Sequence, residues 1–250
     1  MIEDLSDSEL HLWAIIQNHQ DKIVNMSIIQ LSLYAHVSTA TIVRTLKKMG
    51  FSGYSAYRDS LLESTSNNLK YPVLKEADAK IKRVILKSEI EMDNTLSNLK
   101  YKTIEKSVYK TKQAKMIYLF ARGLSENIAK ELQTKFHLTG KYAEMYGEPS
   151  IIKPITSKIK KNCLVIFVTL NGHTPELVEA AKILRKHHVP TITFTTNAKA
   201  TIIPYSNLVF LGYKSQTNYF PKFEVASRMP LQIMARIFMD AYVVRTHNIK

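Results

Sequence analysis

SIIQLSLYAHVSTATIVRTLKKMGFSGYSAYR, residues 27–58, predicts two short helices joined by a tight turn. The first begins at Ser27, because Ser27 and Gln30 have the spacing of a capping box, in which each side chain accepts a free backbone N–H. Ser38 is a second N-cap a few residues later, and Gly50 ends the second helix. Two capped helices this close in sequence cross at a steep angle, which is the geometry of a helix-turn-helix.

The second predicted helix has two opposite faces. At 100° per residue, Ile42, Leu46 and Met49 lie on one side and are expected to pack on the first helix. The opposite face is small and basic, which suits DNA, since arginine makes paired hydrogen bonds to guanine and lysine neutralises phosphates. A solvated basic face without a partner is the alternative interpretation. The candidate DNA-contacting residues are Ser38, Thr39, Thr41, Arg44, Lys47 and Lys48.

Residues 26–53 resemble the N-terminal domain of the RpiR family of bacterial transcription regulators. Members of that family carry a run of the form MSI-x-ELA, VS-x-ATI-x-R and K-x-LGF-x-G, and this chain matches most of it. It departs at His36, where glycine is usual in the turn. If that position needs a left-handed backbone, histidine adopts it at some energetic cost. The resemblance implies a regulator that binds a double-stranded DNA operator.

A further helix is predicted before this motif, because Ser6 and Glu9 form another capping box. The helix is expected to run to about His19 and to bury Leu10, Trp13 and either Ile15 or Ile16. Its acidic residues are expected to lie away from the DNA side; they include Asp7 and Glu9, with Glu3 and Asp4 just before them.

The charge of the chain is distributed unevenly. The formal net charge is +14, with −1 in residues 1–70, +9 in residues 71–162 and +6 in residues 163–250. The N-terminal part is therefore basic only on its predicted DNA-contacting face. The excess elsewhere either attracts DNA or anionic ligands over a distance or serves solubility alone.

Three further features bound the class of protein. Cys163, the single cysteine, opens an apolar run and is expected to be buried, so no disulfide forms within the chain. The N-terminus does not resemble a signal peptide, and no run approaches the ~18 apolar residues of a membrane span. We therefore expect a cytoplasmic protein without membrane contact, and we predict no metal, cofactor or catalytic residue.

The composition divides the chain near residue 73. We expect a helix-turn-helix domain in residues 1–73, ending in the linker STSNNLKYPV (64–73), and a second domain in residues 74–250. The second domain begins with a helical segment, residues 74–112, that packs on this domain or on a partner subunit. Apolar strands then alternate with helices, which indicates a mainly parallel sheet covered on both faces. The predicted strands are residues 116–121, 163–170, 191–197 and 207–212, and the predicted helices are residues 125–139, 175–188 and 223–244.

Two strand-to-helix junctions of this domain share one design, GLSEN (123–127) and TLNGHT (169–174). In an open parallel sheet, ligands bind beyond the carboxyl ends of the strands, where helix N-termini favour an anion. Ser125 and Thr174 either cap their own helices or bind a phosphate. The recurrence of the design on two junctions favours the phosphate site.

The second junction resembles the S-x-S-G-x-T signature of SIS (sugar isomerase) domains, and the first resembles their G-x-S turn. RpiR regulators join this domain to the helix-turn-helix, so the resemblance covers nearly the whole chain. It implies an all-α helix-turn-helix domain followed by a SIS-type α/β domain, with Asn171 replacing a signature serine. Ser227-Arg228 resembles a pair that opens the last helix, where Arg228 either structures the dimer or approaches the ligand. Carried over by position, the ligand-binding residues are Gly123, Ser125, Thr169, Leu170, Asn171, Gly172 and Thr174.

The resemblance implies a transcription regulator whose operator binding is modulated by a sugar phosphate. It is expected to act as a homodimer or a dimer of dimers and not as an enzyme. The alternative is a sugar-phosphate isomerase with an accessory N-terminal domain. Isomerisation needs a base beside the carbonyl carbon, and the candidates are His173 and Glu224.

Overall fold

The computed structural model describes residues 5–24, 26–65, 71–215, 219–220 and 225–247. It divides into two compact units, Met1–Lys87 and Ser88–Lys250. The first unit therefore extends beyond the predicted domain boundary at residue 73, into a helix that begins at Ala79. Each unit is described by itself.

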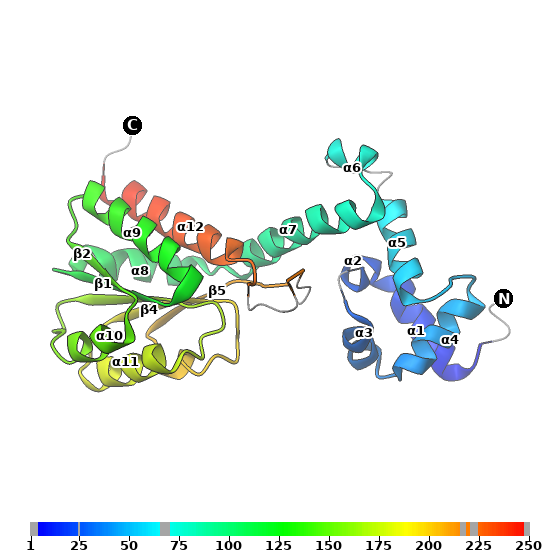
Figure 1. Ribbon diagram of the computed structural model, residues 1–250, viewed down its shortest axis with the longest axis horizontal. Coiled ribbons are helices and arrows are strands. Elements are labelled where there is room, and N and C mark those ends of the chain that lie inside the picture. Colours follow the sequence, from blue (N-terminus) through cyan, green and yellow to red (C-terminus); the bar gives the residue numbers. More distant parts are fainter. Residues whose placement is uncertain (1–4, 25, 66–70, 216–218, 221–224, 248–250) are drawn as a thin grey trace. The chain divides into compact units, whose positions relative to one another are not determined.

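The first unit is helical (Figure 1). The two helices of the predicted helix-turn-helix are confirmed as α3, Ile28–Ala35, and α4, Thr39–Lys48. The remaining helices are α1 (Asp7–Asn18), α2 (Gln20–Ile23), α5 (Tyr54–Thr65), α6 (Val73–Glu76) and the start of α7 (Ala79–Asn98).

The predicted caps explain where α3 and α4 begin. The Gln30 N–H donates to Ser27 Oγ at 3.2 Å, and the Ser27 N–H donates to Gln30 Oε1 at 2.8 Å. The Thr41 N–H donates to Ser38 Oγ at 3.1 Å. Between the two helices, His36 adopts the left-handed conformation, with φ 53° and ψ 37°. The turn therefore has the backbone for which glycine is usual, and histidine adopts it.

The core of the first unit corrects the prediction for α1. Leu10 is 39% exposed, whereas Leu12 and Ile16 are fully buried together with Ile42 and Leu46 of α4. The inward stripe of α1 includes Glu9, which is buried. Of the predicted inward residues, Ile16 is confirmed and Trp13 packs partly buried against the core, whereas Leu10 is wrong because Glu9 occupies the inward position.

The second unit contains a five-stranded, wholly parallel sheet with the strand order β2-β1-β3-β4-β5. Four of its strands are the predicted ones. The fifth is an edge strand of four residues, which alternation of apolar residues did not reveal because only its first residue is buried. The strands are β1 (Ile117–Ala121), β2 (Ala143–Tyr146), β3 (Leu164–Val168), β4 (Thr191–Thr195) and β5 (Leu208–Leu211).

Helices cover both faces of this sheet, as predicted (Figure 1). On one side, α8 (Tyr101–Gln113), α9 (Glu126–Leu138) and α12 (Met229–Thr246) pack on Leu119 and Ile166. On the other, α10 (Pro149–Thr156) and α11 (Pro175–Lys186) pack on Val165 and Phe167. The alternation along β3 thus divides its residues between two apolar cores. Cys163 is buried, as predicted.

The helices differ from the predictions in three places. The segment from residue 74 to residue 112 is not one run but three helices, α6, α7 and α8. The helix α10 was missed, because its sequence PSIIKPIT carries a proline inside the helix. The last helix begins at Met229 and not at residue 223. No helix in the described part of the chain is both long and apolar enough for a membrane span.

Candidate nucleic-acid interface and ligand site

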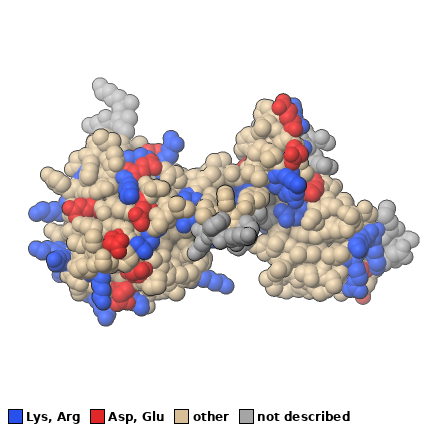
Figure 2. All heavy atoms as spheres, viewed as in Figure 1, with Lys and Arg blue, Asp and Glu red and all other residues tan. Residues whose placement is uncertain are grey.

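The helix α4 presents the predicted basic face. Thr39, Arg44 and Lys47 are exposed, whereas Ile42 and Leu46 are buried. Figure 2 shows lysine and arginine side chains gathered over this helix. Ser38 and Thr41 sit at its start, and their hydroxyl oxygens are 2.8 Å apart. The candidate DNA-contacting residues are thus brought together on one helix and its cap.

One of these residues has a partner that sequence reasoning missed. Lys48 Nζ donates to Glu9 Oε2 of α1 at 2.7 Å, and only 5% of the Glu9 side chain is exposed. The Ser6 N–H donates to the same carboxyl oxygen at 2.9 Å. The bonds from Lys48 and then Ser6 hold the pKa of Glu9 at about 2, below its usual 4.5. Lys48 therefore joins α4 to α1, and a contact of Lys48 with DNA stays a prediction.

The two loops that follow β1 and β3 carry the predicted ligand residues. Ser125 is buried in a short 3-10 turn, Gly123–Ser125, directly before α9. Thr174 is half-buried and precedes Pro175 at the start of α11. Among the described residues, neither hydroxyl makes a capping hydrogen bond to its own helix. The capping interpretation lacks the bonds that it requires at both junctions.

The loop after β3 is held tightly to the end of β4. The Leu170 carbonyl accepts hydrogen bonds from the hydroxyls of Thr195 and Thr196, at 3.0 and 2.9 Å. Gly172 has φ 67°, and a Cβ atom there would lie 2.4 Å from the Cβ of Ala200. Its N–H donates to Thr169 Oγ1 at 3.3 Å. Only glycine fits this position, because both the backbone angle and the space exclude a side chain.

The loop after β1 places a carboxylate where an anion is predicted to bind. Glu126 Oε1 accepts the Gly123 N–H at 2.9 Å. The same carboxylate lies so close to Gly147, after β2, that a Cβ there would be 2.5 Å from Glu126 Cδ. The Gly123 N–H therefore already has an acceptor within the chain.

Asn171, the departure from the SIS signature, contacts a lysine from another loop. Its Oδ1 accepts a hydrogen bond from Lys214 Nζ at 3.0 Å. Its carbonyl accepts from Asn197 Nδ2 at 3.2 Å. Sequence reasoning missed Lys214, although its place three residues after β5 puts it at the same edge of the sheet as the ligand loops.

His173, a candidate base, is bound through both ring nitrogens. Asn197 Oδ1 accepts the Lys199 N–H at 2.9 Å, so the Asn197 amide nitrogen faces His173 Nε2, at 2.8 Å. The Nε2 atom therefore accepts, and Nδ1 lies within hydrogen-bond distance of both the Thr201 backbone nitrogen, at 3.3 Å, and Thr201 Oγ1, at 3.1 Å. The ring joins the loop after β3 to the loop after β4.

The remaining candidates, Ser227, Arg228 and Glu224, come from the segment before the last helix. Ser227 Oγ accepts the Met229 N–H at 3.2 Å, and Arg228 Nη1 donates to the Ala226 carbonyl at 2.7 Å. The choice between the two roles of Arg228 stays open. Glu224 lies outside the described residues. Within the described residues, no three His, Cys, Asp or Glu side chains are grouped as around a metal ion.

Known families match both units of the chain. The helix-turn-helix domain of the rpiR family matches residues 1–68, and the SIS domain matches residues 110–236. The chain belongs to the RpiR family. It is a transcriptional regulator with a SIS sugar-binding domain, and its family implies DNA binding. The resemblance stated from the residues is thereby confirmed.

Relatives of this RpiR-family chain match most of its length. GlvR, an HTH-type transcriptional regulator of Bacillus subtilis (strain 168), is 25% identical over 246 residues, which are 96% of this chain and 91% of GlvR. NanR of Vibrio vulnificus, solved in complex with ManNAc-6P, has a TM-score of 0.61 at 18% identity. The match covers 98% of this chain and 89% of the NanR chain. The sugar isomerase domain of an RpiR transcription factor from Sphaerobacter thermophilus has a TM-score of 0.60 at 17% identity, over 65% of this chain and 89% of its own. The two solved structures share the fold.

Proposed function

We propose that this protein controls transcription by binding an operator through α4 and that a sugar phosphate, held by the loops after β1 and β3, modulates this binding. The proposed ligand site rests on the hydrogen bonding of the Ser125 and Thr174 hydroxyls. Both hydroxyls lie at strand-to-helix junctions of one parallel sheet, and neither caps its helix. A phosphate at such a junction meets hydroxyl donors and the positive end of a helix dipole, and after β1 it replaces the Glu126 carboxylate as acceptor of the Gly123 N–H.

The proposed operator binding rests on the exposed side chains of α4. Arg44 and Lys47 project from a helix whose other face is buried, and both lie near its middle or end. One short helix reads few base pairs, so we propose a homodimer, or a dimer of dimers, that reads half-sites roughly one helical turn (~34 Å) apart. The ligand changes operator affinity only if it binds two arrangements of the protein with different affinity.

The isomerase alternative needs a free base near the bound sugar. His173 Nε2 accepts from Asn197 and its Nδ1 is directed at Thr201, so both nitrogens serve the loop structure. We therefore propose a regulator without isomerase activity. Incubation of the protein with aldose and ketose phosphates tests this point, and interconversion above the rate of a protein-free control would contradict it.

A thermal-shift screen tests the ligand class. Inorganic phosphate, glucose 6-phosphate, ribose 5-phosphate and N-acetylmannosamine 6-phosphate are compared with the same sugars lacking phosphate. A ligand at 100 times its dissociation constant stabilises the protein by ~2.7 kcal/mol, which such a screen detects. Fluorescence anisotropy with an operator selected from random DNA then shows whether the same ligand changes operator affinity. No shift with any phosphate, or operator affinity that never responds, contradicts the proposal.

A further inference from the structure

Lys214 lies beside the candidate phosphate loop although it belongs to a different part of the chain. It follows β5, which is separated from β3 by β4 in the sheet. Its Nζ nevertheless lies 3.0 Å from Asn171 Oδ1, within the loop after β3. The side chain thus reaches across the end of β4 and brings a positive charge to a loop that has none of its own.

The backbone on both sides of Lys214 is fixed by one helix. The Tyr213 N–H donates to Thr95 Oγ1 at 3.0 Å, and the Ser215 N–H donates to Glu91 Oε1 at 2.9 Å. Thr95 and Glu91 are buried side chains of α7. A buried hydrogen bond to a charged group is costly to break, so the segment of residues 213–215 is held in place. Lys214 is therefore positioned before any ligand arrives.

The partner of Lys214 explains the departure from the SIS signature. An asparagine at position 171 carries a neutral amide oxygen, which accepts a hydrogen bond from an ammonium group without cancelling its charge. A phosphate offers charged oxygens, which make shorter and stronger hydrogen bonds to a cation than an amide does. Asn171 thus orients the lysine and leaves its charge available to an anion.

We propose that Lys214 is a phosphate-binding residue of this site, oriented by Asn171 and positioned by Glu91 and Thr95 of α7. This rests on the proposal that the site binds a sugar phosphate. On binding, the Lys214 ammonium exchanges the Asn171 oxygen for a phosphate oxygen, while the hydroxyls of Ser125 and Thr174 donate to the same group. The hydroxyls alone carry no net charge, so Lys214 adds an ionic contribution to the affinity.

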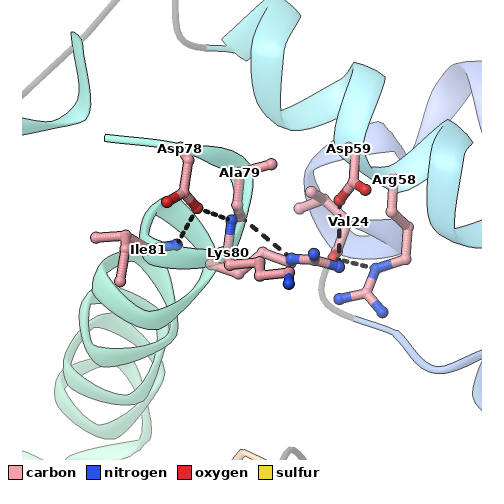
Figure 3. A network of polar contacts seen from close by, with 8 residues as sticks. Val24, Arg58, Asp59, Asp78, Ala79, Lys80 and Ile81 are labelled. Carbon is pink, nitrogen blue, oxygen red and sulfur yellow. Dashed lines mark hydrogen bonds and ion pairs between the residues drawn. The ribbon is translucent and has the colours of Figure 1, made fainter. Parts of the chain in front are cut away.

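The same helix extends into the first unit. Near its start, Asp78 Oδ1 accepts the N–H groups of Lys80 and Ile81, at 2.7 and 3.1 Å (Figure 3). Arg83 of α7 pairs with Asp59 of α5 at 3.3 Å. These contacts hold the start of α7 within the first unit, whereas Glu91 and Thr95 belong to the second unit.

Four proteins test the proposal by isothermal titration with inorganic phosphate and with the phosphates of the screen. They are the wild type, Lys214→Met, Lys214→Arg and the control Lys199→Met. Lys199 is exposed in the loop after β4, so its replacement removes the same charge from the same edge of the sheet. We expect Lys214→Met to weaken binding at least about tenfold and to reduce the dependence of affinity on salt. Lys214→Arg and Lys199→Met are expected to stay within about threefold of the wild type.

The outcomes separate the two proposals. Equal affinity of the wild type and Lys214→Met, with retained secondary structure by circular dichroism, overturns the role of Lys214 and leaves the sugar-phosphate function standing. An equal loss in Lys199→Met shows a general charge effect and also overturns it. A wild type that binds none of the phosphates contradicts both proposals.

Discussion

Among the described residues, Lys48 of the helical unit and Lys214 of the α/β unit both donate to a side-chain oxygen, and these two oxygens differ in charge. Lys48 meets the buried carboxylate of Glu9 at 2.7 Å, and Lys214 meets the amide of Asn171 at 3.0 Å. Removing Lys48 leaves a buried charge without its cation, whereas removing Lys214 leaves a half-buried neutral amide. We therefore expect the Lys48 pair to stabilise the fold, and we expect the ammonium group of Lys214 to remain available to bind an anion.

The largest expected effect concerns a residue on the same helix as Lys48. Within the described residues Arg44 forms no ion pair, so Arg44→Ala should leave the fold intact and abolish specific operator binding. Each lost base contact costs about 1–3 kcal/mol, and a symmetric dimer loses two. Fluorescence anisotropy measures the affinity, and Lys47→Ala serves as the control, because it should weaken specific and non-specific DNA binding alike and flatten the salt dependence. Unchanged operator affinity in Arg44→Ala would remove α4 from the DNA interface.

The second prediction concerns the partner of Lys214, which is replaced by a carboxylate like the one that Lys48 meets. Asn171→Asp places a carboxylate against the lysine and a negative charge against the phosphate. We expect phosphate affinity to fall by about tenfold or more, while Asn171→Ser keeps it within a few-fold of the wild type. Isothermal titration compares the three proteins. Equal affinity in Asn171→Asp would place the phosphate outside this loop.

The third prediction compares how much stability the protein loses when Lys48 or Lys214 is replaced. Lys48→Met should lower the free energy of unfolding by about 1–3 kcal/mol, because Glu9 loses a hydrogen bond while buried. Lys214→Met should change it by less than about 0.5 kcal/mol, as should the control Lys47→Met on the exposed face of α4. Urea denaturation gives all three values. Similar losses in Lys48→Met and Lys214→Met would refute the comparison.

The Glu9 carboxyl adds a pH signature to the same pair. Folding lowers the pKa of Glu9 from 4.5 to about 2, so its stabilisation is complete above pH ~4.5 and is lost as the pH falls toward 2. Lys48→Met removes the main cause of that shift. The wild type should therefore lose more stability than Lys48→Met between these pH values, as measured by urea denaturation at each pH. Parallel curves for the two proteins would show that Lys48 does not hold the pKa down.

The smallest effect on stability is expected at the two loop hydroxyls. Since neither Ser125 nor Thr174 caps its helix, the double alanine variant should lose well below the ~1 kcal/mol per site that a cap contributes. Operator binding should be normal, and the response to the sugar phosphate should disappear. Melting temperature and ligand response are measured on one preparation. A large drop in melting temperature with an intact response would restore the capping interpretation.

Short-range patterns predicted much of this fold correctly. The capping boxes at Ser27 and at Ser6 depend on residues three apart, and the structure contains both. The parallel sheet followed from runs such as CLVIFVTL, since a strand buried on both faces has no polar alternation. The errors occur where distant residues decide. Glu9 lies in the inward stripe of α1 only because Lys48, far along the chain, pairs with it.

The sequence by itself determined the two helices of the DNA-binding motif, the alternation of strands and helices, and the loops at Ser125 and Thr174, because caps, glycines and apolar periods act within a few residues. Tertiary structure alone decided which charges are bound to which partners. Lys48 meets Glu9 across 39 positions and Lys214 meets Asn171 across 43. Such pairs depend on how helices pack and on the order of strands in the sheet, and a single sequence carries no local signal for either.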